Sequence, residues 1–549
     1  MKLLFFSLLF QSLLIMERVD HLYSCVREGG DILQERGCGQ SMSEVPEGFE
    51  MPEVAISKIR QSASLLVTRD GSTGVEILFC HRVSQMPSFP NFWAFPGGGV
   101  NQFDRDTAEE LSYFPKGEDG SALVALMREM VEEVGWAPSE DGLVMVSSPV
   151  RDLVVEDGNN WYQLVDDGQI PINPEGFQII SIRTTPPLTP MRFTNRFFHL
   201  HDSNPPTPTH PNGRSEFDEF CWLTPKQALE EWIDCRMRIP PPQITLLRNI
   251  ISALSKNEGD IISAMSDMAT QPQTGEHRIE FAPGVECVPL STYTLPPATH
   301  TNCYIVGNLG SEYIVVDPAA REKSSLEYLE RRIRAVEKLG GRIIATVFTH
   351  KHPDHIGDME AISRIYQAPI WASEETLETL TTSESLKVLA EGDTIILGDK
   401  TWHVLETPGH CPGHLCLSSD VGMITGDMAV MVGTILVPPS DGDMEKYITS
   451  LERIRDEKPP MLFPAHGPLS PVPEKLLERY IKHRNKRHAL VFEAVKNGLS
   501  NISEIADYAY KDTPEAHPFL KTDQTLSHLL AHERRGDVVH IQDKWYLAE

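Results

Sequence analysis

Hydrophobic and polar positions follow two different periods along the chain, and each period predicts a different kind of element. Strand-type patterns cover 63–67 and 75–79, where apolar and β-branched residues are bounded by turn residues. Apolar residues at helical spacing predict helices over 122–136 and 326–339. The run 342–348 is apolar and rich in β-branched residues, which predicts a strand that ends in a tight loop before a helix.

The C-terminal segment, 471–549, has a pattern of its own. The elements predicted there are, in order, one long amphipathic helix over 474–497, shorter helices over 502–510 and 525–535, and a hairpin of two strands over 538–541 and 544–547. Helices followed by a β-hairpin are typical of a winged helix. We therefore expect a C-terminal winged helix.

These patterns divide the chain into segments of different character. A chain of 549 residues is long enough for two to four domains. The expected segments are an N-terminal extension (1–58), a first domain (59–255), a polar linker (256–280), a second domain (281–470) and a helix-plus-winged-helix domain (471–549). The fold class expected is α+β, with several domains.

The N-terminal extension begins with Lys2 and an apolar run over 3–15, which resembles the core of a signal peptide. The run is too short to span a bilayer, and no clean small-residue cleavage site follows it. Met16 and Met42 are alternative start positions. We expect either a targeting segment or an over-extended start, with a cytoplasmic or mitochondrial location favoured over secretion, and no integral membrane segment.

Charge and cysteine content narrow the function classes. The formal net charge of −29 argues against affinity for nucleic acid over the whole surface, but not against a local basic track. Nine cysteines lie scattered without a CxxC pair, which predicts a reducing compartment rather than a disulfide framework. The C-terminal segment is neutral and carries a basic run at 482–488. The predicted RNA contacts in this run are Lys482, Arg484, Lys486 and Arg487.

The strongest chemical signal follows the strand predicted over 342–348. His350, His352, Asp354 and His355 lie within six residues, and imidazole and carboxylate are the ligands that zinc prefers alongside thiolate. Three further His or Asp residues stand beside Gly or Pro, as ligands on tight loops do: His410, Asp427 and His466. A His-rich surface loop without metal is the alternative, and the ordered series of four motifs disfavours it.

These motifs resemble the metallo-β-lactamase superfamily, closest to its glyoxalase-II-like branch, and Asp317-Pro318 after a strand resembles its first motif. The resemblance implies an αββα sandwich with two Zn²⁺ ions at one sheet edge. It assigns His350, His352 and His410 to site one, and Asp354, His355 and His466 to site two, with Asp427 bridging both ions. Asp354 would also be catalytic and orient the hydroxide.

Cys411 and His414 lie close to these ligands in the sequence but are not assigned to either zinc site. Cys411 stands where the superfamily usually has Thr or Ser. It is either an outer neighbour of the metals or a small buried residue, and we favour the second. His414 is expected to be structural rather than a ligand.

The helix over 122–136 carries the second chemical signal. Glu129, Glu132 and Glu133 stand at i, i+3 and i+4 and share one face, with Arg128 placed to pair with Glu132. Crowded carboxylates repel one another unless a cation lies among them, and their hard oxygens suit Mg²⁺ or Mn²⁺. A solvated acidic face is the commoner fate of such residues. Upstream, Gly97 and Gly98 would let a phosphate-bearing substrate approach the backbone.

This region, about 62–255, resembles the Nudix hydrolases, in particular their coenzyme A diphosphatase subgroup, through the box around 128–135 and the segment 191–198. The resemblance implies an α/β/α sandwich, with Glu132 as a catalytic carboxylate. Gly120 stands where the family has a Glu, so the domain is expected to be active, weak, or a substrate-binding relic.

The second and third domains together, 280–549, resemble the β-lactamase-like endoribonucleases of animal mitochondria. That likeness implies zinc-dependent cleavage of single-stranded RNA, which is the function expected. The alternative is a thioesterase acting on acyl-coenzyme A together with the Nudix-like domain. A third option makes the Nudix-like domain an inactive sensor or scaffold. A homodimer is compatible with each.

Overall fold

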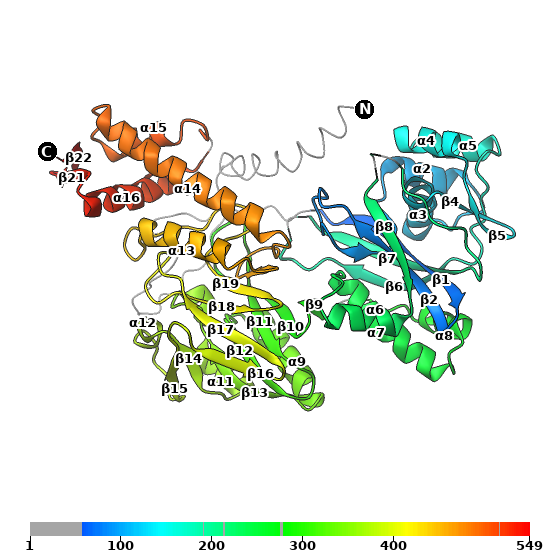
Figure 1. The fold of residues 1–549 in the computed structure, drawn as a ribbon, viewed down its shortest axis with the longest axis horizontal. Coiled ribbons are helices and arrows are strands. Elements are labelled where there is room, and N and C mark those ends of the chain that lie inside the picture. Colours follow the sequence, from blue (N-terminus) through cyan, green and yellow to red (C-terminus); the bar gives the residue numbers. More distant parts are fainter. Residues whose placement is uncertain are drawn as a thin grey trace. The chain divides into compact units, whose positions relative to one another are not determined.

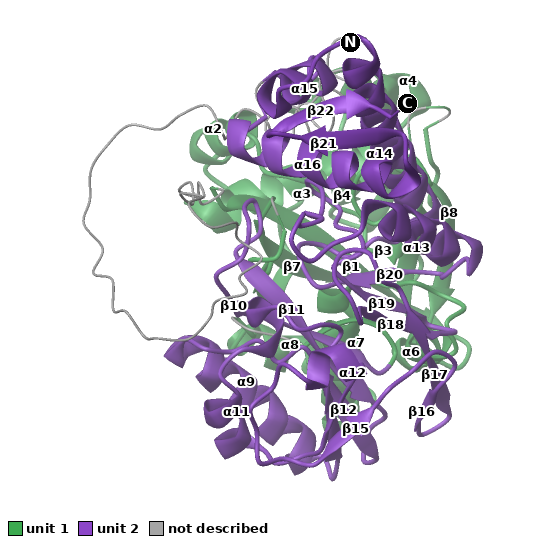
Figure 2. Cartoon of the chain, turned by 90° about the vertical axis from the view of Figure 1, so that its left-hand side faces the viewer, with its two compact units in different colours: residues 1, 56–283 green, residues 2–55, 284–549 purple. Residues whose placement is uncertain are grey.

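The computed structural model describes residues 58–189, 191–211, 213, 215–274, 278–514 and 516–548. The described chain forms two compact units, one ending at Pro283 and the other beginning at Gly284, which Figure 2 colours separately. The predicted N-terminal extension lies outside the described residues except for Lys58. None of the helices in these ranges is both long and apolar enough to cross a membrane.

The first unit is built around one mixed sheet (Figure 1). Its strand order is β3 (Trp93–Ala94), β2 (Gly74–Arg82), β1 (Arg60–Gly71), β7 (Phe193–His201) and β6 (Gln178–Thr184), with β8 (Phe217–Leu223) also paired to β2. Successive residues of β1 point to opposite faces. Leu65 and Val67 pack beneath α3 (Glu118–Val134), whereas Leu66 packs beneath α7 (Pro241–Lys256). The layers are therefore α/β/α, as the sequence predicted.

Two segments of this unit differ from the sequence prediction because a few buried residues anchor helices in polar stretches. The residues before the predicted helix 122–136, for which no element was predicted, contain α2 (Gln102–Glu110), whose first turn is held by a capping box of Asn101 and Asp104. The predicted linker 256–280 contains α8 (Ile261–Thr270), capped by Asp260. Its buried side chains, Ile261, Ala264 and Met265, belong to the core of the first unit. This part of the predicted linker is therefore an integral part of the first unit.

The remaining elements of the first unit lie around this sandwich. They are β4 (Trp136–Ser139), β5 (Gly142–Met145), α4 (Ser148–Glu156), α5 (Asn160–Asp166) and α6 (Pro225–Ile233). The last strand before the boundary at Pro283, β9 (Ile279–Ala282), is not part of this sheet.

The second unit contains two sheets that face each other. The first has the order β15 (Leu386–Val388), β14 (Ile370–Ala372), β13 (Arg342–Val347), β12 (Glu312–Val316), β11 (His300–Gly307) and β10 (Val285–Ser291). The second has the order β16 (Thr394–Leu397), β17 (Lys400–Glu406), β18 (Leu415–Ser419), β19 (Gly422–Gly426) and β20 (Leu462–Pro464). Tyr304 and Phe463 meet between them, with ring centroids 5.9 Å apart.

Helices cover the outer face of each sheet, which gives the αββα layers predicted. α9 (Lys323–Lys338) and α11 (Met359–Ile365) share a core with the first sheet. α13 (Met444–Asp456) and the first half of α14 (Pro473–Lys496) share a core with the second. Two short helices, α10 (Pro353–Ile356) and α12 (Glu374–Leu377), lie in the connections.

The C-terminal elements match the sequence prediction closely. α15 spans Ile502–Ala509 and α16 spans Pro518–Arg535, beginning earlier than predicted, and β21 (Val538–Ile541) pairs with β22 (Lys544–Leu547). These elements have a core of their own, yet α14 joins it to the core of the second sheet. Residues from 471 on therefore belong to the same compact unit as the sandwich, and their classification as a winged helix stays a prediction.

Candidate metal centre

The register of parallel strands brings the predicted zinc ligands to one edge of the sandwich. Val316 at the end of β12 pairs with Val347 at the end of β13, so Asp317 and the histidine motif leave the first sheet at the same edge. In the second sheet, Gly426 pairs with Pro464, so Asp427 and His466 also leave together. His410 lies in the loop between β17 and β18, and Asp354 and His355 lie on α10.

The structure brings all seven predicted zinc ligands into one cluster. His352 Nδ1 lies 3.1 Å from His350 Nε2 and 2.9 Å from His410 Nε2. The nearest carboxylate oxygens of Asp427 lie 3.8 Å from His410 Nε2, 3.5 Å from His355 Nε2 and 3.4 Å from His466 Nε2. Asp354 Oδ2 lies 3.5 Å from His466 Nε2. Asp427 thus stands between the two groups, as a bridging ligand must, and the ligand assignment remains a prediction that this geometry supports.

The chemistry of the cluster fits a pair of cations. Each of the seven side chains is at most 6% exposed, so water does not satisfy their polar atoms. Among the described residues, six buried atoms of the cluster have no hydrogen-bond partner: both carboxylate oxygens of Asp354 and of Asp427, and Nε2 of His355 and of His466. Buried polar atoms are costly to leave unpaired, so their convergence indicates a metal centre.

The outward-facing nitrogens of these imidazoles are held by partners outside the cluster. The hydrogen-bond distances are 3.0 Å from His350 Nδ1 to Thr349 Oγ1, 2.8 Å from His410 Nδ1 to the Leu436 carbonyl, 3.0 Å from His466 Nδ1 to the His300 carbonyl, and 2.9 Å from His355 Nδ1 to Asp317 Oδ2. Such partners fix the tautomer and the ring orientation of a ligand histidine. The carbonyls of Leu436 and His300 could not be found from sequence, because any residue type supplies a carbonyl.

Asp441 is a further residue that the sequence did not indicate. Its Oδ2 lies 3.5 Å from His352 Nε2, and its Oδ1 accepts a hydrogen bond of 2.9 Å from Lys351 Nζ. His352 thus faces the cluster with Nδ1 and this carboxylate with Nε2.

His414 is structural, as predicted. Its Nε2 accepts a hydrogen bond from the backbone N–H of Asp427 at 3.1 Å, and its Nδ1 lies 2.9 Å from Thr407 Oγ1. Cys411 is fully buried, and its sulfur lies within 4.8 Å of ligand nitrogens of His350 and His352. It is therefore both a small buried residue and a neighbour of the centre.

The pKa values of the histidines in this cluster shift in opposite directions. Burial alone would lower the pKa of His355, but the carboxylates of Asp427 and Asp354 outweigh it and raise that pKa well above its usual value. The pKa of His466 is raised in the same way, by Asp427 and Asp354. In contrast, burial and the neighbouring His352 lower the pKa of His410 to about 4. Neutral imidazole is the form that binds zinc, so His410 is already in its binding form at neutral pH.

The glutamates of α3 form a second, different cluster. Arg128 Nη1 donates to Glu129 at 3.0 Å and, as predicted, to Glu132 at 2.8 Å. Arg128 Nε donates to Asp104 at 3.0 Å, a partner on α2 that the sequence did not reveal. Glu133 accepts the Gly97 N–H at 2.7 Å. The chain's own arginine therefore neutralises much of this cluster.

Part of the second cluster still leaves room for a cation. Glu133 Oε1 is buried and has no hydrogen-bond partner among the described residues. Burial raises the pKa of Glu132 to about 7 and that of Glu133 well above its usual value, and Glu129 adds to both. A Cβ at Gly98 would lie 2.1 Å from Glu129 Oε1, so a side chain there would displace this carboxylate. Within the described ranges, however, the three glutamates do not bring ligand atoms within 4.8 Å of one another, whereas trios from the zinc cluster do.

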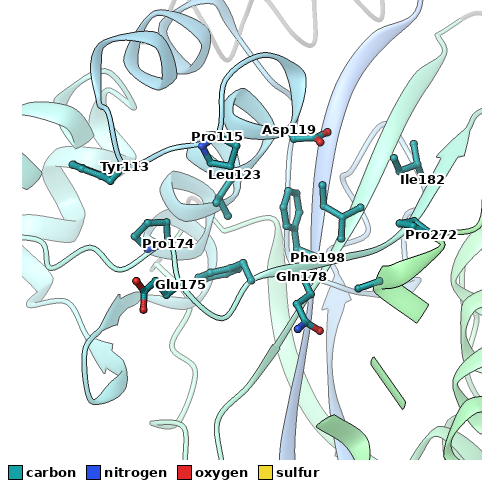
Figure 3. Close-up of a pocket in the computed structure, with 13 residues that line it drawn as sticks. Tyr113, Pro115, Asp119, Leu123, Pro174, Glu175, Gln178, Ile182, Phe198 and Pro272 are labelled. Carbon is teal, nitrogen blue, oxygen red and sulfur yellow. The ribbon is translucent and has the colours of Figure 1, made fainter. Parts of the chain in front are cut away.

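A cavity of about 520 Å³ opens beside the start of α3 (Figure 3). Aromatic rings and prolines, among them Tyr113, Phe198 and Pro174, line it together with Asp119 and Glu175. Asp119 accepts a 2.6 Å hydrogen bond from Arg196, which lies in the segment 191–198 singled out in the sequence. The cavity is large enough for a small molecule.

The predicted RNA contacts are only partly exposed, and this corrects part of the prediction. Arg484 and Arg487 are 1% and 2% exposed and donate to groups inside the second unit, so they are not available to a nucleic acid. Lys486 pairs with Asp512, and Lys482 remains exposed. Helical periodicity places 484 and 487 on the same face, which is the face that α14 buries.

Comparison with known proteins identifies the sandwich. Residues 296–466 match the model of the metallo-beta-lactamase superfamily. The chain is 27% identical over 228 residues to the beta-lactamase-like protein 2 homolog of Drosophila melanogaster, covering 39% of this chain and 76% of that protein. It is also 27% identical over 199 residues to an atrochrysone carboxyl ACP thioesterase of Aspergillus fumigatus, covering 36% of this chain and 60% of that protein.

Among solved structures, a NUDIX hydrolase from Alicyclobacillus acidocaldarius is similar, with 24% identity and a TM-score of 0.35, covering 40% of this chain and 100% of that one. The match to the family model shows that residues 296–466 form a metallo-β-lactamase superfamily domain, and members of this superfamily are metal-dependent hydrolases.

Proposed function

Taking residues 296–466 as a metallo-β-lactamase superfamily domain, we propose that the chain is a zinc-dependent thioesterase that acts on acyl-coenzyme A or a similar acyl-carrier thioester. The observation that carries the proposal is the convergence of seven buried His and Asp side chains whose facing atoms lack partners. Zinc bound there supplies a water of lowered pKa and polarises the substrate carbonyl.

The residues of the chain have separate tasks in this reaction. The two groups of histidines would hold the ions, and Asp427, which lies between the two groups, would contribute a carboxylate to both. Asp354, whose two carboxylate oxygens have no hydrogen-bond partner among the described residues, would accept a proton from the attacking water. Burial of the whole cluster excludes bulk water, which strengthens each of these electrostatic interactions.

The substrate class follows from two observations. One relative is named as a thioesterase that acts on an acyl carrier protein, and this supports a thioester substrate. Arg484 and Arg487, two of the four predicted RNA contacts, are buried, and this weakens the prediction of single-stranded RNA as the substrate. RNA cleavage therefore becomes the alternative outcome of the test rather than the leading proposal.

We further propose that the first unit hydrolyses a diphosphate with Mg²⁺ or Mn²⁺, or retains only the binding of such a substrate. The observation that favours this is the buried Glu133, which accepts the Gly97 N–H and leaves Oε1 without a hydrogen-bond partner among the described residues. Glu132→Gln separates the two options. It lowers coenzyme A diphosphate cleavage if the unit is an enzyme, and it changes nothing if the unit is a sensor or scaffold.

The test of the main proposal uses zinc-loaded protein beside an Asp354→Ala variant. We expect thiol release from acyl-coenzyme A, followed with a thiol-reactive dye, to fall at least about 100-fold in the variant. Cleavage of labelled single-stranded RNA that depends on Asp354, without thiol release, would replace the thioesterase by a nuclease. Absence of both reactions in zinc-loaded protein would contradict either substrate class.

A further inference from the structure

The irregular segment 430–441, between β19 and α13, carries two of the groups that orient the predicted zinc ligands. The Leu436 carbonyl accepts from His410 Nδ1 at 2.8 Å, and Asp441 faces His352 Nε2 at 3.5 Å. The segment forms neither helix nor strand, so backbone hydrogen bonds of a regular element do not hold it. Its position must be fixed by whatever contacts it.

Side chains from the C-terminal helices make those contacts on both sides of Leu436. Gln524 of α16 accepts from the Val437 N–H at 3.2 Å and donates to the Val437 carbonyl at 3.0 Å. Ser527 donates to the same carbonyl at 2.6 Å. Arg484 of α14 donates to the Ile435 carbonyl and, at 3.0 Å, to Gln524 Oε1. The residues before and after Leu436 are thus each bound by a C-terminal side chain.

These hydrogen bonds are shielded from water. Arg484 is 1% exposed, Gln524 7% and Ser527 4%. A buried arginine that lost these acceptors would remain uncompensated, so the network holds only when all of its members are in place.

Two tyrosine hydroxyls, those of Tyr480 on α14 and Tyr447 on α13, hold the start of the segment and the residues just before it. The Tyr480 hydroxyl accepts from the Val430 N–H at 3.0 Å. The Tyr447 hydroxyl donates to the Met428 carbonyl, next to the bridging Asp427, at 2.6 Å. The guanidinium of Arg484 lies 5.4 Å from the centre of the Tyr447 ring, which links the two sets of contacts.

We infer that Arg484 and Gln524 are positioning residues of the metal centre, because they fix the Leu436 carbonyl and through it the orientation of His410. The inference rests on the proposed two-metal centre. It gives the buried part of the basic run a role in place of RNA contact, and it makes the C-terminal helices a part of the hydrolase. Residues that act on a metal ligand in this way change metal affinity about 10- to 100-fold.

The test compares Arg484→Met and Gln524→Met with Lys482→Met in the full-length protein. Methionine is close in length to glutamine and shorter than arginine, it stays apolar when buried, and it removes the hydrogen bonds of both side chains. Lys482 is an exposed residue of the helix that carries Arg484. The readouts are the zinc dissociation constant by chelator competition and the visible spectrum of the Co²⁺ form, which reports the ligand geometry. Near-ultraviolet circular dichroism of the metal-free protein shows which variants fold.

We expect Gln524→Met and Arg484→Met to weaken zinc binding about 10- to 100-fold and to alter the Co²⁺ spectrum, with Lys482→Met matching the wild type. Folded Gln524→Met with wild-type zinc affinity and spectrum would overturn the inference, even if Arg484→Met did not fold. A merely structural role would lower the unfolding temperature and leave the spectrum unchanged. Wild-type protein that bound no zinc would instead contradict the proposed function itself.

Discussion

The two clusters of buried carboxylates in this chain have their negative charge compensated in different ways. In the first unit, Arg128 pairs with Asp104, Glu129 and Glu132, so one cation of the chain contacts three of the carboxylates. In the second unit, Asp354 and Asp427 face only imidazoles, and their oxygens have no hydrogen-bond partner within the described ranges.

This difference separates a carboxylate cluster that is stable alone from one that needs a cation. A buried carboxylate keeps its charge only if a positive group compensates it. Where an arginine compensates the carboxylate charge, a metal ion is not needed for that purpose. Where only histidines surround the carboxylates, a metal ion compensates their charge and leaves the histidines neutral. The second cluster is therefore the stronger indication of a metal site, although the first has the more acidic sequence pattern.

The largest effect is expected from removing the cation of the first cluster. Arg128→Met leaves three carboxylates without their partner, which should lower the free energy of unfolding of the first unit by about 3–5 kcal/mol. Hydrogen exchange of the α3 amides measures this locally. The matched control is Arg105→Met, a half-buried arginine on α2 whose side chain donates to the Asn101 carbonyl and not to these carboxylates. An unchanged exchange rate in Arg128→Met would show that these carboxylates do not depend on the arginine. A partial recovery of protection with Mg²⁺ would show that another cation can replace it.

A smaller effect is expected at the outer partner of His355. Asp317 accepts from Thr349 N at 2.8 Å, from Thr349 Oγ1 at 2.7 Å and from His355 Nδ1 at 2.9 Å. Asp317→Asn keeps the size but replaces an acceptor by a donor, so we expect zinc affinity at the second site to fall about 10- to 100-fold. Metal titration measures it, with Asp358→Asn as the control. Equal affinities would show that the orientation of His355 does not depend on this carboxylate.

The smallest effect concerns two histidines of the C-terminal helices, the half-buried His488 and the buried His528. Burial, followed by the effect of His532, lowers the pKa of His488 to about 4, and burial with Arg484 lowers the pKa of His528 well below its usual value. Other charged or titratable groups facing this pair are His483, Arg535 and Asp537.

The sign of the pH dependence follows from these lowered pKa values. The unfolded chain takes up protons near pH 6.5 and the folded chain only near 4 or below, so stability falls as pH decreases from 6.5 toward 4. We expect a loss of about 1 kcal/mol per imidazole at pH 5.5. Thermal unfolding at pH 7.5 and 5.5 measures it, and His488→Asn should reduce the difference. A steeper pH dependence in His488→Asn would contradict the assignment.

Sequence patterns predicted the elements whose apolar period is long, such as α14, and the ligands that stand on short motifs, such as His350 and His352. They missed α8, because only a few apolar residues in a polar stretch hold it to the first unit. They also misjudged Arg484, because a basic run gives no indication of which helix face is buried. The Leu436 carbonyl and Asp441 depend on tertiary contacts and carry no local signal.

The bridging role of Asp427 is the central claim, and zinc content tests it most directly. Asp427→Asn is compared with Asp420→Asn, an exposed aspartate whose side chain pairs with Lys400 at 2.7 Å. After zinc loading and gel filtration, we expect two zinc ions per chain in the wild type and in Asp420→Asn. Asp427→Asn should hold fewer than two and lose thiol release at least about 100-fold. Two zinc ions and full activity in Asp427→Asn would contradict the account.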